Sequence, residues 1–172
     1  VHLASISGGT DIVSCFVLGN LYQPVYSGEI QNKALGMDVR VFNEKGQSVL
    51  NKKGELVCVN PFPSMPLKFW NDKNNKKFEN AYFNKFKNIW YHGDYAKITN
   101  NNGFIISGRS DTTLNPGGVR LGTAEIYSEI ERFDEIKESL VVGQSWENDI
   151  RIILFVILNL KFRLTEDLIT RM

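Results

Sequence analysis

The chain has little cysteine, and neither sign of charge is in excess. Its two cysteines, Cys15 and Cys58, lie far apart and lack the close spacing of a zinc site or a disulfide framework. We expect both to act as small buried hydrophobic residues, which fits a reducing compartment. The 20 basic residues almost balance the 19 acidic ones, and the formal net charge is +1. This balance gives no electrostatic reason to expect binding to nucleic acid or to an anionic membrane.

Long apolar runs and a targeting leader are also missing. The longest apolar run, residues 152–158, is far too short to span a bilayer. The chain begins at Val1 without an initiator Met or a basic-then-apolar leader. It starts inside a strand-like run and ends at Met172 inside a helix-like one. We therefore expect a soluble, cytosolic protein without a membrane span, and an internal fragment of a longer chain.

The apolar residues that are present predict a packed core of strands and helices. Hydrophobic residues make up 42% of the chain, which is enough for one domain or parts of two. Met37, Val39 and Val41 alternate with polar residues, as in a half-buried strand. Residues 95–107 predict a hairpin around an Asn-Gly turn. Together these patterns predict a mixed α/β (α+β) fold.

Two further apolar patterns have the period of a helix. Phe78, Tyr82 and Phe86 recur at every fourth position, which predicts one apolar face of a helix and favours a core role over a cofactor site. A second helix is expected to open at Thr123, a plausible N-cap. Strands are expected at residues 139–143 and 151–158, followed by a helix at 165–171.

Two glycine-containing segments combine residue types that suit an anionic ligand. The first, residues 7–11, reads SGGTD and lacks the G-K-[ST] ending of a P-loop. It could cradle a phosphate, or it could be a strand-to-helix turn capped by Thr10 or Asp11. The second, residues 108–131, places paired glycines between two arginines, which supply planar donors for phosphate or carboxylate. It could equally be an exposed turn between a strand and a helix.

Several motifs in a fixed order carry a resemblance to a known family. R-x-D at Arg109 is followed by LNPGGVRLGTAEIY, which fits G-x-R-[IL]-G-x-x-E-I. Upstream are SGGTDIVSCF at residues 7–16 and PFPSMP at residues 61–66. The chain resembles the adenylate-forming enzymes of the acyl-CoA synthetase and luciferase superfamily. The likeness is strongest to its acetoacetate-activating members, and it runs from Val1 to about Leu158.

The resemblance implies two domains. Residues 1–111 would be the C-terminal part of the large AMP-binding domain, including its distorted β-barrel subdomain. Residues 112–172 would be the truncated start of the small, mobile C-terminal α+β domain. Asp111 would be the hinge on which the small domain swings, and a hinge residue must absorb a large change in φ and ψ. Thr112 stands where many relatives have a second Asp.

The resemblance also implies a set of nucleotide contacts. Thr10, beside Gly9, would touch the α-phosphate and act in catalysis. Asp11, where the family has Glu, would help hold Mg²⁺ with a shorter reach. Asp94 would accept hydrogen bonds from the ribose hydroxyls of ATP. His92 stands where the family usually has Thr, and a structural role is preferred for it.

The remaining implied contacts lie in the second glycine-containing segment. Arg109 would contact the ribose or a phosphate, and Arg120 would approach a phosphate and act in catalysis. Gly117 and Gly118 would line the path of the coenzyme A pantetheine. The family's phosphate loop would lie before Val1 and its catalytic lysine beyond Met172.

The implied reaction is the ATP-dependent ligation of acetoacetate to coenzyme A through an acyl-adenylate, which places the parent enzyme in lipid and ketone-body metabolism. ATP, Mg²⁺ and coenzyme A are the implied cosubstrates. The 172 residues alone are expected to be inactive or nearly so. Three alternatives stay open: a synthetase for another short-chain acid, a truncated nucleotide-binding module without catalysis, and a purely structural β-rich domain.

Overall fold

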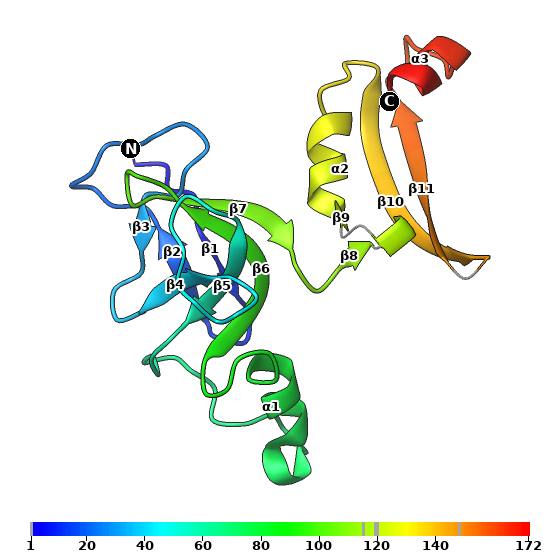
Figure 1. The fold of residues 1–172 in the computed structure, drawn as a ribbon. Helices are drawn as coiled ribbons and strands as arrows, with labels where there is room; N and C mark the ends of the chain where they lie inside the picture. The colour runs from blue at the N-terminus through cyan, green and yellow to red at the C-terminus, as the bar shows by residue number, and fades with distance from the viewer. Residues whose placement is uncertain (1, 115, 119–120, 148) are drawn as a thin grey trace. The chain divides into compact units, whose positions relative to one another are not determined.

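The computed structural model describes residues 2–114, 116–118, 121–147 and 149–172. The chain divides into two compact units, Val1–Ile106 and Ser107–Met172 (Figure 1). This division falls before Arg109, whereas the domain boundary predicted from the sequence lies after Asp111. Helices and strands occur in both units, so the predicted mixed α/β class is confirmed. The assignment of the units to named domains of the family stays a prediction.

The first unit contains two sheets. β1 (Ser7–Gly9), β2 (Ser14–Leu18) and β3 (Asn32–Lys33) form an antiparallel sheet in that order. The second sheet has the order β4 (Val39–Phe42), β5 (Gly54–Cys58), β6 (Trp90–Ile98) and β7 (Phe104–Arg109). The strands of the described ranges form open sheets and no closed barrel. The predicted distorted barrel therefore stays a prediction.

Strand β5 has a side chain buried on each of its two faces. Leu56 belongs to the main core cluster with Val39 and Val41, whereas Val57 packs with Phe42 and Phe86. On β4 the alternation predicted from the sequence is confirmed, because Val39 and Val41 are buried while Arg40 is exposed.

The predicted aromatic stripe is right for two of its three residues. Helix α1 (Lys76–Tyr82), preceded by the short helix η1 (Lys73–Asn75), places Phe78 in the core and stacks Tyr82 on Trp90, with ring centroids 3.7 Å apart. The helix ends at Tyr82, so Phe86 does not lie on the same helix face. Phe86 packs edge-on against Phe42 in the second cluster instead.

The second unit is built on one long hairpin. β10 (Ile136–Trp146) pairs antiparallel with β11 (Asp149–Leu158). Before it come β8 (Thr113–Leu114), the short helix η2 (Pro116–Gly118), β9 (Leu121–Gly122) and helix α2 (Thr123–Ile130), and after it comes α3 (Glu166–Arg171). The hairpin is longer than predicted.

Helix ends in the second unit differ in how they are capped. The N-cap of α2 is Gly122, without a side-chain hydrogen bond, so the predicted capping role of Thr123 is wrong. Helix α3 does have a side-chain cap, because Thr165 Oγ1 accepts a hydrogen bond from the Leu168 amide at 3.2 Å.

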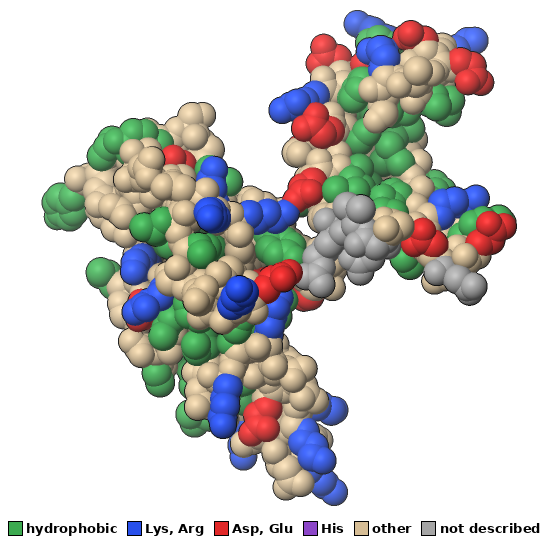
Figure 2. Space-filling view, viewed as in Figure 1, with side chains coloured by type: hydrophobic (Ala, Val, Ile, Leu, Met, Phe, Trp, Pro, Cys, Tyr) green, Lys and Arg blue, Asp and Glu red, His purple; other side chains and the backbone are tan. Residues whose placement is uncertain are grey.

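Hydrophobic side chains remain on the surface of each unit (Figure 2). Leu3, Tyr22, Leu35 and Trp70 are each about nine-tenths exposed or more. None of the described helices is long and apolar enough to cross a membrane.

The two cysteines are free thiols in different environments. Cys58 is buried, as predicted, whereas Cys15 is only partly buried. Burial raises the pKa of the Cys58 thiol to about 11 from an ordinary 9.0. At a pH between 9.0 and about 11, the Cys58 thiol keeps its proton in the folded protein and loses it in the unfolded chain. The free energy of unfolding should therefore fall as the pH rises above about 9.

The buried thiol gives a testable difference between the two cysteines. At pH 8 a thiol with a pKa of about 11 is ionised in roughly one molecule in a thousand, and only the thiolate is alkylated quickly. We expect iodoacetamide to label Cys15 of the native protein and to leave Cys58 unlabelled until urea is added. Peptide mass spectrometry measures both residues in one sample, and equal native labelling would contradict the assignment.

Candidate functional site

A bulge in β6 brings the side chains of His92 and Asp94 close together. Tyr91 lies opposite Val57 on β5 and Tyr95 lies opposite Glu55. His92, Gly93 and Asp94 thus face the single residue Leu56, and the register shifts there. Gly93 has a φ of 82°, which favours glycine. The bulge sets His92 beside β1 and Asp94 beside His92, and both residues are less than one-tenth exposed.

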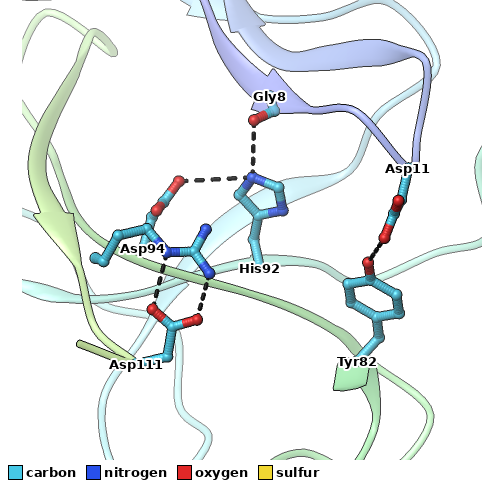
Figure 3. Close-up of polar contacts among 7 residues, drawn as sticks. Gly8, Asp11, Tyr82, His92, Asp94 and Asp111 are labelled. Carbon is cyan, nitrogen blue, oxygen red and sulfur yellow. Dashed lines mark hydrogen bonds and ion pairs between the residues drawn. The ribbon is translucent and has the colours of Figure 1, made fainter. Parts of the chain in front are cut away.

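His92 joins this bulge to the glycine-rich segment predicted to bind nucleotide (Figure 3). Its Nε2 lies 3.1 Å from the carbonyl oxygen of Gly8 and 3.5 Å from Oδ2 of Asp94. The next residue, Gly9, lies against the imidazole ring. The structure therefore brings two of the predicted site residues, Gly9 and Asp94, next to one buried histidine.

Thr10 and Asp11 occupy a turn between two strands. The Val13 amide donates to the Thr10 carbonyl oxygen at 3.1 Å, and the chain continues into β2. The alternative of a strand-to-helix turn is therefore wrong. The side chains of Thr10 and Asp11 are exposed, and the Asp11 carboxylate accepts a hydrogen bond from the Tyr82 hydroxyl (Figure 3). Nothing in the sequence pattern marked Tyr82 as a partner of Asp11.

Among the described residues, Asp11 is not part of a preformed metal site. Within the described parts of the chain, no three His, Cys, Asp or Glu side chains are grouped so that they could hold a metal ion. Mg²⁺ commonly uses only one or two protein carboxylates, with phosphate oxygens and water completing its shell. A single exposed carboxylate is compatible with that mode of binding.

In the second unit, Arg109 and Asp111 pair directly. The guanidinium donates through Nε to Asp111 Oδ1 at 2.8 Å and through Nη2 to Oδ2, which is a two-pronged ion pair (Figure 3). Both side chains are about half exposed. Gly108, with a φ of 97°, fits closely against Ala124 of α2. The structure thus brings these two predicted residues together at the end of β7.

The loop predicted to contact coenzyme A has a partner that sequence reasoning missed. Gly117 has a φ of 57° and open space beside its Cα, and its amide donates to both carboxylate oxygens of Asp149, at 3.0 and 2.9 Å. Asp149 comes from β11, too distant in sequence for a motif to reveal it. Gly118 is the last residue of η2. Arg120, predicted to contact a phosphate, lies outside the described residues.

Comparisons with known proteins find acetoacetyl-CoA synthetases both among curated sequences and among solved structures. No family model matches the chain. It is 58% identical over 168 residues to an acetoacetyl-coenzyme A synthetase of Rhizobium meliloti, and 50% identical over 173 residues to an acetoacetyl-CoA synthetase of Xenopus tropicalis. These matches cover 98% and 99% of the chain, which spans only 26% of each relative.

A solved structure extends the likeness to the fold. The acetoacetyl-CoA synthetase from Streptomyces lividans matches with a TM-score of 0.85 and 42% identity, over 98% of this chain and 25% of that one. The chain therefore corresponds to about a quarter of these relatives. The resemblance expected from the motifs is confirmed, because over nearly its whole length the chain is similar in sequence and in fold to acetoacetyl-CoA synthetases.

Proposed function

We propose that the protein carrying this chain ligates acetoacetate to coenzyme A at the expense of ATP, through an acyl-adenylate, with release of AMP and pyrophosphate. The observation that carries the proposal is the 58% identity to an acetoacetyl-coenzyme A synthetase across nearly the whole chain. The clustering of Gly9, His92 and Asp94 supports it, because the predicted phosphate segment lies next to the predicted ribose acceptor. We further propose that the enzyme works in the cytosol.

The first unit supplies the contacts to ATP in this proposal. Asp94 accepts hydrogen bonds from the ribose hydroxyls, since its carboxylate offers two oxygens in one plane. Thr10 donates its hydroxyl to the α-phosphate, where charge develops as the acetoacetate carboxylate attacks phosphorus. Its exposed side chain on the turn after β1 is free of the core and can meet a ligand.

Asp11 completes the phosphate contacts by holding Mg²⁺ together with phosphate oxygens. When bound there, the ion would supply positive charge that stabilises the negative charge on the phosphates of ATP. Because the Tyr82 hydroxyl already donates to the Asp11 carboxylate, that side chain is oriented in advance. Arg120 is proposed to approach a phosphate and to act in catalysis, as expected from its motif.

The second unit supplies the contacts that change between the two half-reactions. In the proposal, residues 1–111 end the large AMP-binding domain and residues 112–172 begin the small one, with Asp111 as the pivot. Arg109 contacts ribose or phosphate. Gly117 and Gly118 line the pantetheine path, where the open space beside Gly117 admits a ligand. The exposed apolar side chains of both units are proposed to be covered by the rest of a longer protein.

Acid specificity separates this proposal from its nearest alternative. Product formation by the intact protein from its source should be highest with acetoacetate and at least about tenfold lower with acetate or longer acids, as expected for acids that differ in length or in a polar group. The measurement is AMP formation with a panel of short acids. A preference for another acid would favour a different acyl-CoA synthetase. Nucleotide binding without AMP formation would favour a non-catalytic module.

A substitution at Asp94 tests the ribose assignment. Asp94→Ala removes both acceptor oxygens, and we expect the KM for ATP of the intact protein to rise about tenfold or more. Asp38→Ala is the matched control, because Asp38 is also a carboxylate of the first unit but pairs with Arg40 at the surface. Equal KM values for ATP in both variants would support the purely structural alternative.

A proline at the proposed hinge tests the role of Asp111. Asp111→Pro fixes φ, so the chain can no longer adopt two orientations freely. We expect one half-reaction to slow at least about tenfold while the other changes less than about threefold. Pyrophosphate exchange and thioester formation measure the two steps separately. Asp111→Ala is the control, since it keeps the backbone mobile and removes the exposed ion pair with Arg109. Equal slowing of both half-reactions by proline would contradict the assignment.

A further inference from the structure

A single N–H of His92 faces two oxygens on different strands. A carbonyl oxygen can only accept a hydrogen bond, so the contact at 3.1 Å to Gly8 requires a proton on Nε2 of His92. The same nitrogen lies 3.5 Å from Oδ2 of Asp94. The N–H therefore links the main chain of β1 to the carboxylate in the bulge of β6.

The imidazole ring is held so that this nitrogen keeps its direction. The Phe16 ring meets it edge-on, with centroids 4.7 Å apart. On Gly9 even a methyl group would come within 2.9 Å of the ring carbon Cε1, so the chain closes tightly against the imidazole. Only 9% of His92 is exposed. A ring confined in this way points its N–H in one direction without losing further side-chain freedom when a ligand binds.

From this geometry we infer that His92 is a positioning residue for the nucleotide, which fixes the Asp94 carboxylate relative to the Gly8–Gly9 strand that leads into Thr10. The inference rests on the proposed function, in which Asp94 binds the ribose. A carboxylate oxygen has room for a second hydrogen bond, so Oδ2 can face His92 and still accept from a hydroxyl group. In this role His92 contacts neither the phosphate of ATP nor acetoacetate. It acts through its two partners, Gly8 and Asp94.

Two substitutions of His92 by amide side chains distinguish a role in positioning Asp94 from a role in packing alone. In His92→Gln the side-chain nitrogen lies the same number of bonds from Cβ as the histidine Nε2, whereas in His92→Asn it lies one bond closer. We expect His92→Gln to keep the KM for ATP of the intact protein within about threefold. We expect His92→Asn to raise it about tenfold or more, as for the loss of a hydrogen bond to a charged group.

The second readout is discrimination between ATP and 2′-deoxy-ATP, measured as the ratio of kcat/KM. A displaced Asp94 carboxylate would bind the ribose hydroxyls poorly. The ratio of kcat/KM for ATP to that for 2′-deoxy-ATP should therefore fall in His92→Asn and be retained in His92→Gln. Thermal unfolding of both variants is recorded alongside. If the two variants shift KM and discrimination equally, His92 serves packing alone and the inference is overturned, whatever their melting temperatures.

Asp94→Asn in the same series separates failure of the inference from failure of the proposed function. If Asp94→Asn leaves the discrimination unchanged, the ribose assignment fails and the role of His92 falls with it. If Asp94→Asn lowers the discrimination while His92→Asn does not, the proposed function stands and the inference about His92 is overturned.

Discussion

The bulge in β6 is the constraint on which the arrangement in the first unit depends. On both sides of it the strand is held in register, with Trp90 opposite Cys58 and Ala96 opposite Gly54. Trp90 and Ala96 are fully or almost fully buried, so the strand cannot slip to remove the extra residues. The added length must be taken up between them, at a glycine with positive φ. The bulge thus turns His92 toward β1, with Asp94 beside it, as a consequence of core packing.

Burial makes the polar group at this bulge sensitive to geometry. His92 and Asp94 are almost completely removed from water, and a buried polar group without its hydrogen bond costs about 1–3 kcal/mol. The shared N–H of His92 therefore couples two parts of the main chain that the hydrophobic core alone would position only approximately. Around it, Phe16, Phe62 and Trp90 meet edge to face and keep the surroundings rigid.

Local patterns allowed much of the fold and part of the site to be predicted. The alternation on β4, the hairpin of β6 and β7 and the helix from Thr123 follow from periodicity and turn residues. The motifs singled out Asp94 and Arg109, whose roles stay predictions. Contacts between distant segments could not be predicted: Tyr82 with Asp11, Asp149 with Gly117, and Phe86 with Phe42. The bulge itself was missed because alternation of buried residues does not reveal how a strand pairs with its neighbour.

The two groups of site residues differ in how tightly they are held. His92 and Asp94 are buried, and moving either one would leave polar atoms unsatisfied in the core. Arg109 and Asp111 are about half exposed, where an ion pair contributes only about 0–1 kcal/mol because water and salt replace it readily. A contact that is so easily exchanged suits a segment proposed to change its backbone conformation between half-reactions. The buried group suits the opposite requirement of the proposed function, which is to keep a ribose and a phosphate at one separation throughout the reaction.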